Sequence, residues 1–217
     1  MPGVRRRSRK KSRYEPAGNG PLMRASPIPV FFARDARAMR RAALDDSAIT
    51  HADPRCRIAC AAFSAAIRHA IATPDATPQS MTDAAEAELR PAADAIPSPR
   101  PRELARRDDP GLDEGKVHFY RHMGFVRVAF RVAFWELLHA PTFEAAILDC
   151  ANRGGDADTN AAIAGALYGA LVGEDAIPAA WREKVSNACT GPGWEGNVWA
   201  DAYHPRRLFC VAPGDTA

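Results

Sequence analysis

Cysteine is scarce in this sequence, and its apolar runs are short. The 217 residues include five cysteines, an odd number at scattered positions. This argues against a disulfide framework and is typical of the reducing cytoplasm. No apolar stretch approaches the length that spans a bilayer, and no apolar segment with a cleavage site marks a secretory signal. The sequence therefore predicts a cytoplasmic protein without a membrane partner.

Strand patterns, internal repeats and a dinucleotide-type glycine loop are missing as well. Apolar and small residues instead recur at helical spacing, and a hydrophobic content of 47% with 25% charged residues is ordinary for a soluble globular protein. Helices are expected over residues 31–44, 54–72, 82–89, 117–139, 142–152 and 159–171, with a last one starting at 178. The sequence therefore predicts an all-α protein, folded as a compact multi-helix bundle.

Acidic residues are missing from residues 1–13, which carry seven of the 29 Lys and Arg residues. The other 22 basic residues face 26 acidic ones, so the formal charge beyond this segment is −4, against +3 for the whole chain. Such a run is typical of a nucleic-acid-binding arm or a localisation signal, but a solvated tail has the same composition. No aromatic side chain is interleaved as a base-stacking surface requires, so we favour the tail and expect no nucleic-acid partner. The expected organisation is a basic, disordered tail over 1–16, a helical domain over 17–190 and an irregular tail over 191–217.

Two carboxylates and a hydroxyl lie close together in the segment GGDADTN, residues 154–160, at the start of an expected helix. Oxygen ligands of this kind suit Mg²⁺, Mn²⁺ or Ca²⁺. Because residues two apart do not share a face of a regular helix, Asp156 and Asp158 can converge only where the helix begins. Gly154 and Gly155 would let the backbone approach a ligand closely. The alternative is that one aspartate simply caps the helix, since Asp is a preferred N-cap residue.

The sequence that follows this motif, and two segments before it, resemble motifs of a known protein family. Residues 154–181, GGDADTNAAIAGALYGALVGEDAIPAAW, closely resemble the C-terminal signature of the ADP-ribosylglycohydrolase family. Upstream, GNGPLMR over residues 18–24 resembles the family's GNG-x-x-MR loop, and THADPR over residues 50–55 resembles its T-H-x-D-P-R turn. By these three motifs in the family's order, the chain is identified as a member of the family.

The resemblance implies a site for two metal ions, Mg²⁺ or Mn²⁺, that holds the ribose of ADP-ribose. Carried over to this sequence, it makes Asp156, Asp158 and Thr159 metal ligands, the two aspartates acting in catalysis through the bound metal. The residues that it assigns to substrate binding are Gly18, Asn19, Gly20, His51 and Gly155. Without the resemblance, GNG is only a turn signal, and a lone His before a helix is more often a structural residue.

One motif of the family is missing, an N-terminal Thr-Asp-Asp segment that carries its other metal ligands. Only sixteen residues precede Ala17, and Glu15 is the single acid among them. The chain is therefore expected to be a family domain that is incomplete at the N-terminus and lacks half of the metal ligands. One expectation is a metal-dependent hydrolase that removes ADP-ribose from protein side chains, with arginine as the favoured linkage. The alternative is a catalytically inactive fragment or an ADP-ribose-binding remnant. The expected partner is an ADP-ribosylated protein or a small ADP-ribosyl compound.

Overall fold

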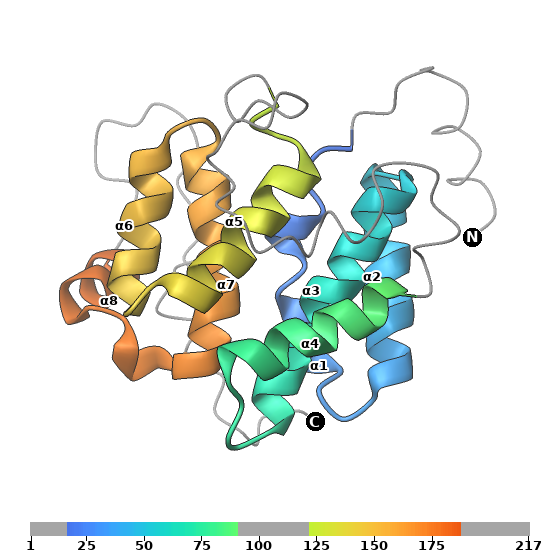
Figure 1. The fold of residues 1–217 in the computed structure, drawn as a ribbon, viewed down its shortest axis with the longest axis horizontal. Coiled ribbons are helices and arrows are strands. Elements are labelled where there is room, and N and C mark those ends of the chain that lie inside the picture. The colour runs from blue at the N-terminus through green and yellow to red at the C-terminus, as the bar shows by residue number, and fades with distance from the viewer. Residues whose placement is uncertain (1–16, 91–121, 188–217) are drawn as a thin grey trace. The chain divides into compact units, whose positions relative to one another are not determined.

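The computed structural model describes residues 17–90 and 122–187 of the chain (Figure 1). Its helices are η2 (Leu22–Arg24), α1 (Pro27–Phe31), α2 (Ala36–Thr50), α3 (Pro54–Ala72), α4 (Pro78–Leu89), α5 (Val126–His139), α6 (Phe143–Arg153), α7 (Ala157–Val172), η5 (Glu174–Ala176) and α8 (Ala179–Ser186), where η marks a 3-10 helix. No strand forms within these two ranges, where one isolated antiparallel bridge pairs Gly18 with Phe125. The prediction of an all-α protein is confirmed. The two predicted tails, 1–16 and 191–217, lie outside the described residues.

Short polar side chains determine where two of the helices begin, as the sequence predicted. Asp53 accepts a hydrogen bond from the backbone N–H of Arg55 at 2.8 Å, and Pro54 occupies the first helical position of α3. Thr142 accepts from the backbone N–H of Ala145 at 3.1 Å and begins α6. Each side chain thus satisfies an N–H that has no partner within its own helix.

The predicted helix over 31–44 is wrong in its bounds, because residues 32–35 are not helical and separate two helices. α1 ends at Phe31, and α2 begins only after Asp35. The Asp35 carboxylate accepts from the N–H groups of Arg37 at 3.0 Å and Ala38 at 2.9 Å. The Ala- and Arg-rich pattern runs on through this break, so periodicity alone does not reveal it.

The start of α4 also differs from the prediction, since the helix begins at Pro78 and not at 82. Thr77 and Ser80 form a reciprocal capping box: the Thr77 hydroxyl accepts from the Ser80 N–H at 3.1 Å, and the Ser80 hydroxyl accepts from the Thr77 N–H at 3.0 Å. Such a box satisfies two donors at one helix start. The first helical turn that it supports contains few apolar residues and was therefore missed.

Helices α3 and α7 lie at the centre of the first part of the chain, residues 17–173. α3 packs against α1, α2, α4, α5 and α7, while α7 packs against α3, α5, α6 and η2, as Figure 1 shows. The buried residues of α3 are Cys56, Ile58, Ala59, Cys60, Ala61, Ala62, Phe63, Ser64, Ala66 and Ile67. Most of these side chains are small, so they let neighbouring helices come close on several sides.

Glycines of α7 bring α6 close to it. A Cβ built at Gly165 would lie 3.1 Å from Ile147 Cδ1, and one at Gly169 would lie 3.7 Å from the ring of Phe143. The Tyr168 hydroxyl on the same helix donates to the backbone oxygen of Ala140 at 2.9 Å. These contacts fix α7 from one side, so its N-terminal end has a defined position.

The chain divides into two compact units, with the boundary between Gly173 and Glu174. In the second unit the described residues form η5 and α8. Pro178 is the N-cap of α8, so the helix begins at Ala179, one residue later than expected. Arg182 of α8 pairs with Glu174 at 3.5 Å. None of the described helices is both long and apolar enough to cross a membrane. The domain limits of 17 and 190 stay a prediction.

Candidate functional site

The GNG loop lies against the start of α5. The Asn19 N–H donates to the Gly124 backbone oxygen at 2.9 Å, and the Val126 N–H donates to the Ala17 backbone oxygen at 2.8 Å. Gly18, between these two contacts, forms the bridge with Phe125. Backbone hydrogen bonds on both sides therefore hold the loop in one position.

Asn19 connects this loop to the start of α7. Its side chain belongs to a residue that is only 7% exposed, and the amide Nδ2 donates to Oδ2 of Asp156 at 2.6 Å. A short hydrogen bond to a carboxylate is a strong one. The structure thus brings together two of the predicted site residues, one from each end of the described chain.

Asp156 occupies the N-cap position of α7 without capping it. Its side chain accepts no hydrogen bond from the first turn of the helix, while its backbone oxygen accepts from the Asn160 N–H at 3.0 Å. Asp158 lies exposed in the first turn, and Thr159 is half-buried beside it. The alternative that the Asp156 side chain is present simply to cap the helix is therefore wrong.

Two glycines shape the turn that leads into α7. Gly154 has φ +71° and Gly155 has φ +65°, both in the left-handed region. A side chain at either position would strain the backbone. The turn delivers Asp156 to Asn19 and leaves Gly155 exposed, without a side chain, beside the aspartates.

The imidazole of His51 lies over the GNG loop. A Cβ built at Gly18 would lie 2.9 Å from His51 Nε2, and one at Gly20 would lie 3.1 Å from His51 Cε1. The first distance is too short for any real contact. A side chain at position 18 would therefore have to displace the histidine ring.

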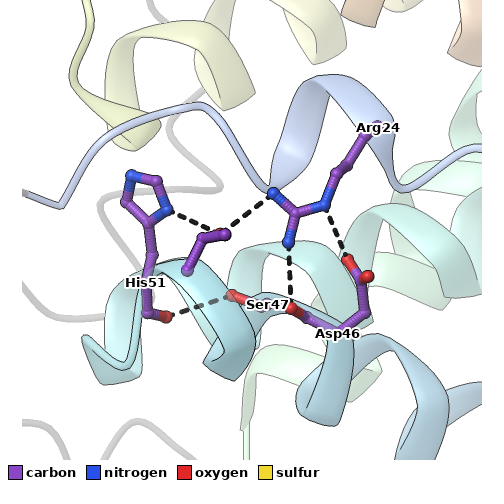
Figure 2. Close-up of polar contacts among 5 residues, drawn as sticks. Arg24, Asp46, Ser47 and His51 are labelled. Atoms are coloured by element: carbon purple, nitrogen blue, oxygen red, sulfur yellow. Dashed lines mark hydrogen bonds and ion pairs between the residues drawn. The ribbon is translucent and has the colours of Figure 1, made fainter. Parts of the chain in front are cut away.

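The C-terminal end of α2 is held by Arg24, the last residue of η2 (Figure 2). Its Nη1 donates to the Thr50 hydroxyl at 2.9 Å, its Nη2 donates to the Asp46 backbone oxygen at 2.9 Å, and its Nε pairs with the Asp46 carboxylate at 3.2 Å. Nδ1 of His51 lies 3.0 Å from the same Thr50 hydroxyl. His51 is the C-cap of α2, and its N–H donates to the Ser47 backbone oxygen at 2.8 Å.

Asp53 and Arg55 form a partly buried ion pair at the start of α3. Arg55 Nε and Nη2 donate to the two carboxylate oxygens of Asp53 at 2.9 Å and 2.7 Å. Burial alone would raise the pKa of Asp53, but the hydrogen bonds from Arg55 outweigh it and hold this pKa below its ordinary value. The hydrogen bond to Asp53 likewise raises the pKa of Arg55. The guanidinium also lies over the ring of Phe125, 5.4 Å from its centroid, which ties α3 to the start of α5.

Of the residues predicted for the site, the structure brings most into one neighbourhood. Contacts join His51 to Gly18 and Gly20, and Asn19 to Asp156, while Gly155 and Asp158 lie within two residues of Asp156 in the chain. Sequence reasoning missed the supporting residues, which are Arg24, Thr50, Arg55, Gly124 and Phe125. Arg24 and Arg55 stand inside the GNG-x-x-MR and T-H-x-D-P-R motifs, so the motifs themselves could have pointed to them.

The oxygen atoms at the start of α7 have the chemistry that Mg²⁺ and Mn²⁺ prefer: two carboxylates and the Thr159 hydroxyl. Asn160, one position further, is 1% exposed, and neither atom of its amide has a hydrogen-bond partner among the described residues. Over the same part of the chain, no group of three or more His, Cys, Asp or Glu side chains lies close enough to hold a metal ion. The residues present therefore fit part of a coordination shell, which water or further ligands would complete.

Taken together, the described residues form an all-helical protein in which acidic side chains at a helix start lie beside a glycine loop that a histidine covers. The chain belongs to the ADP-ribosylglycohydrolase family, whose model matches residues 2–206.

Curated relatives and one solved structure resemble it. An ADP-ribosylarginine hydrolase Tri1 from Pseudomonas putida (strain GB-1) is 30% identical over 175 residues, which are 80% of this chain and 44% of the relative. The ADP-ribosyl-[dinitrogen reductase] glycohydrolase of Rhodospirillum rubrum is 48% identical over 44 residues, 20% of this chain and 15% of that protein. A solved structure, an ADP-ribosylglycohydrolase-related protein complex, is 26% identical with a TM-score of 0.58 and is matched over 77% of this chain and 54% of its own. The chain thus spans less than half of the first relative's length.

Proposed function

We propose that the protein is a metal-dependent ADP-ribosylglycohydrolase that removes ADP-ribose from modified protein side chains, with arginine as the linked residue. Membership of the family supports the reaction. Arginine is supported by relatives named as ADP-ribosylarginine hydrolases in Pseudomonas putida and in Serratia proteamaculans (strain 568), the latter 26% identical over 171 residues. Action in the cytoplasm remains part of the proposal.

The observation that carries the proposal is the hydrogen bond between Asn19 and Asp156. It joins the glycine loop to the acidic helix start at 2.6 Å, so the two motifs lie together, as a single site requires. Neither motif alone distinguishes a binding site from a turn or a helix cap.

Each residue of this site has a role in the proposed reaction. Asp156, Asp158 and Thr159 would hold Mg²⁺ or Mn²⁺, and a bound metal would orient the sugar hydroxyls and activate the attacking water. Asn19, held by Asp156, keeps the loop close to the helix start. Gly18 and Gly20 let the His51 ring pack against the loop, whose backbone N–H groups would bind a phosphate.

His51 completes the set of residues around the loop. Its ring lies against Gly18 and Gly20, where it can bind the diphosphate or adenosine side of ADP-ribose. In this role the histidine binds and orients the ligand, while the reacting bond lies on the side of Asp156 and Asp158.

A second function is an ADP-ribose-binding remnant without hydrolase activity. It is favoured by one observation, that the described residues contain no group of three or more His, Cys, Asp or Glu able to hold a metal ion. A site with few ligands binds a divalent cation weakly, because few protein oxygens replace the waters that the cation loses. The glycine loop and His51 would still bind ADP-ribose.

The experiment that separates the two functions uses the full 217-residue chain. The protein is incubated with an ADP-ribosylarginine peptide in Mn²⁺ or Mg²⁺ and, in parallel, with a chelator, and released ADP-ribose is measured by chromatography. Calorimetry with ADP-ribose reports binding in the same samples. Metal-dependent release supports the hydrolase, and binding without release supports the remnant. A chain that neither binds ADP-ribose nor releases it would overturn both.

A further inference from the structure

Arg24 is joined to its surroundings by all three nitrogens of its guanidinium group. Nη2 and Nε contact the backbone oxygen and the carboxylate of Asp46, and Nη1 donates to the Thr50 hydroxyl. A planar guanidinium with its donors engaged in this way has a fixed orientation. The Thr50 hydroxyl is consequently held at one place, directly between Arg24 and His51.

Hydrogen-bond stoichiometry decides what Thr50 does for His51. A threonine hydroxyl has one proton to donate and two lone pairs to accept with. One lone pair receives the Arg24 N–H, and the only other contact of this hydroxyl within the described residues is Nδ1 of His51, at 3.0 Å. If Nδ1 accepts the Thr50 proton, that proton has an acceptor within the protein, whereas a protonated Nδ1 would leave it to solvent, since Thr50 is exposed.

The same short segment carries both Arg24 and the loop that His51 covers. The N–H groups of Leu22 and Met23 donate to the Asn19 backbone oxygen at 2.9 Å and 3.1 Å, which fixes η2 relative to the GNG loop. η2 ends at Arg24. The loop and the arginine therefore move together, so the position of the arginine is set by the loop itself.

We propose that Arg24 is a positioning residue that acts through Thr50 to fix the orientation and the tautomer of His51. The Thr50 hydroxyl donates to Nδ1, so the ring proton of neutral His51 resides on Nε2. Nε2 is the atom that lies over Gly18, 2.9 Å from where a Cβ would be. His51 therefore presents a hydrogen-bond donor at the GNG loop, the polarity that suits a phosphate oxygen.

This inference rests on the proposed function for the identity of the ligand, because a donor at this place is useful to the diphosphate of ADP-ribose. The tautomer of the free protein does not depend on any ligand. The two ideas can therefore fail separately.

The test combines nitrogen NMR with binding of ADP-ribose. The full chain is labelled with ¹⁵N at its histidines, and the signals of His51 are assigned by their loss in His51→Gln. Long-range proton–nitrogen spectra recorded near pH 8, above the ordinary pKa of histidine, report which ring nitrogen carries the proton. In the parent we expect a protonated Nε2 and an unprotonated Nδ1.

Four variants show whether Arg24 and Thr50 are responsible. Thr50→Val removes the hydroxyl at nearly constant volume, and Thr50→Ser keeps it. Arg24→Gln removes the guanidinium, and Arg40→Gln removes a comparable arginine that pairs with Glu88 away from the site. We expect the Thr50→Val and Arg24→Gln signals to move toward a mixture of tautomers, with ADP-ribose bound about threefold to tenfold more weakly, the effect of one lost hydrogen bond. Thr50→Ser and Arg40→Gln should match the parent.

Unchanged His51 signals in both Thr50→Val and Arg24→Gln would overturn the proposal. So would a protonated Nδ1 in the parent. If Arg24→Gln loses helix content in circular dichroism, Thr50→Val decides, since Thr50 is exposed at the end of α2. A tautomer that responds as expected in a chain that fails to bind ADP-ribose would sustain the positioning role and reject the proposed function.

Discussion

Helices α3 and α7 both begin at an aspartate, and the two aspartates do opposite things. Asp53 serves its own helix: its carboxylate accepts from the Arg55 backbone at 2.8 Å and pairs with the Arg55 side chain. Asp156 makes no cap contact with its helix and instead accepts from Asn19 at 2.6 Å. The same residue type at the same position is thus structural in one helix and part of the candidate site in the other.

Neighbouring residues account for the difference. Asp53 is followed by Pro54, which has no N–H and a backbone angle preset for a helix start. Asp156 follows two glycines with positive φ, and its own backbone has φ −86° and ψ 57°. The turn at α7 therefore points the carboxylate away from the helix and toward another part of the chain.

The largest effect should come from the start of α7. Asp158→Ala should abolish Mn²⁺ binding and any hydrolase activity, because it removes one of the two carboxylates proposed to hold the metal. Calorimetry with Mn²⁺ and chromatography of released ADP-ribose measure the two quantities. Asp75→Ala, a change in the exposed turn between α3 and α4, is the control and should leave both unchanged. If Asp158→Ala bound Mn²⁺ as the parent does, the assignment of the site would be wrong.

The loop that lies between the two helix starts offers the next test. The Gly18 backbone oxygen accepts from the Cys56 thiol of α3 at 3.3 Å, and the His51 ring lies above it. Gly18→Ala should displace the ring and weaken ADP-ribose binding about tenfold, since overpacking costs about 1–3 kcal/mol. Gly124→Ala is the matched control, because a Cβ there meets nothing within 4 Å. Equal affinities of the two variants would remove the steric argument for glycine at position 18.

For the free energy of unfolding, we expect Asp53 to matter more than Asp156, the reverse of their expected importance for binding. Asp53→Ala should lower the free energy of unfolding by about 1–2 kcal/mol, the usual effect of losing an N-cap. Asp156→Asn should change it by no more than about 0.5 kcal/mol, because an asparagine oxygen still accepts from Asn19. Urea unfolding followed by circular dichroism measures both. Comparable losses in both variants would mean that Asp156 also stabilises the start of its helix.

The smallest effect is expected in how the free energy of unfolding changes at acidic pH. The pKa of Asp53 is lowered in the folded protein, so its ionised form contributes stability above its unfolded pKa of about 3.9. That contribution is lost as the pH falls through the lowered folded pKa. The difference in unfolding free energy between the parent and Asp53→Asn should therefore be constant above about pH 5 and shrink below about pH 4. A difference that grows in acid would contradict the ion pair with Arg55.

Local features of the fold could be predicted from the sequence, because they depend on residues next to one another. The starts of α3 and α6 follow from Asp53 and Thr142, because each is a short polar side chain that precedes apolar residues at helical spacing. The break between α1 and α2 was missed because Asp35 interrupts a pattern that stays helical on both sides. Periodicity reports which face of a helix is apolar and says little about one residue that ends it.

The residues of the candidate site could be predicted from the sequence, but the contacts between them could not. Three motifs in family order pointed to Asn19, His51 and Asp156, and the structure brings them together. Nothing in the sequence says that the Asn19 amide meets Asp156 or that Arg24 reaches Thr50, because such contacts follow from how the helices pack. Arg24 was given no role of its own by the motif, whereas in the structure it holds the residue next to His51.

The hydrogen bond from Asn19 to Asp156 joins residues 137 positions apart, and this separation bears on how the protein folds. Closing so long a loop costs more entropy than closing a helical turn or a helix pair, and contacts of high sequence separation slow folding. Chains that have formed α2, α3 and α4 but not yet placed α7 would be helical and partly compact, yet without the loop-to-helix contact. We therefore expect the contact between Asn19 and Asp156 to form late in folding, so that ligand binding at these residues would report a folded chain in a way that helix content does not.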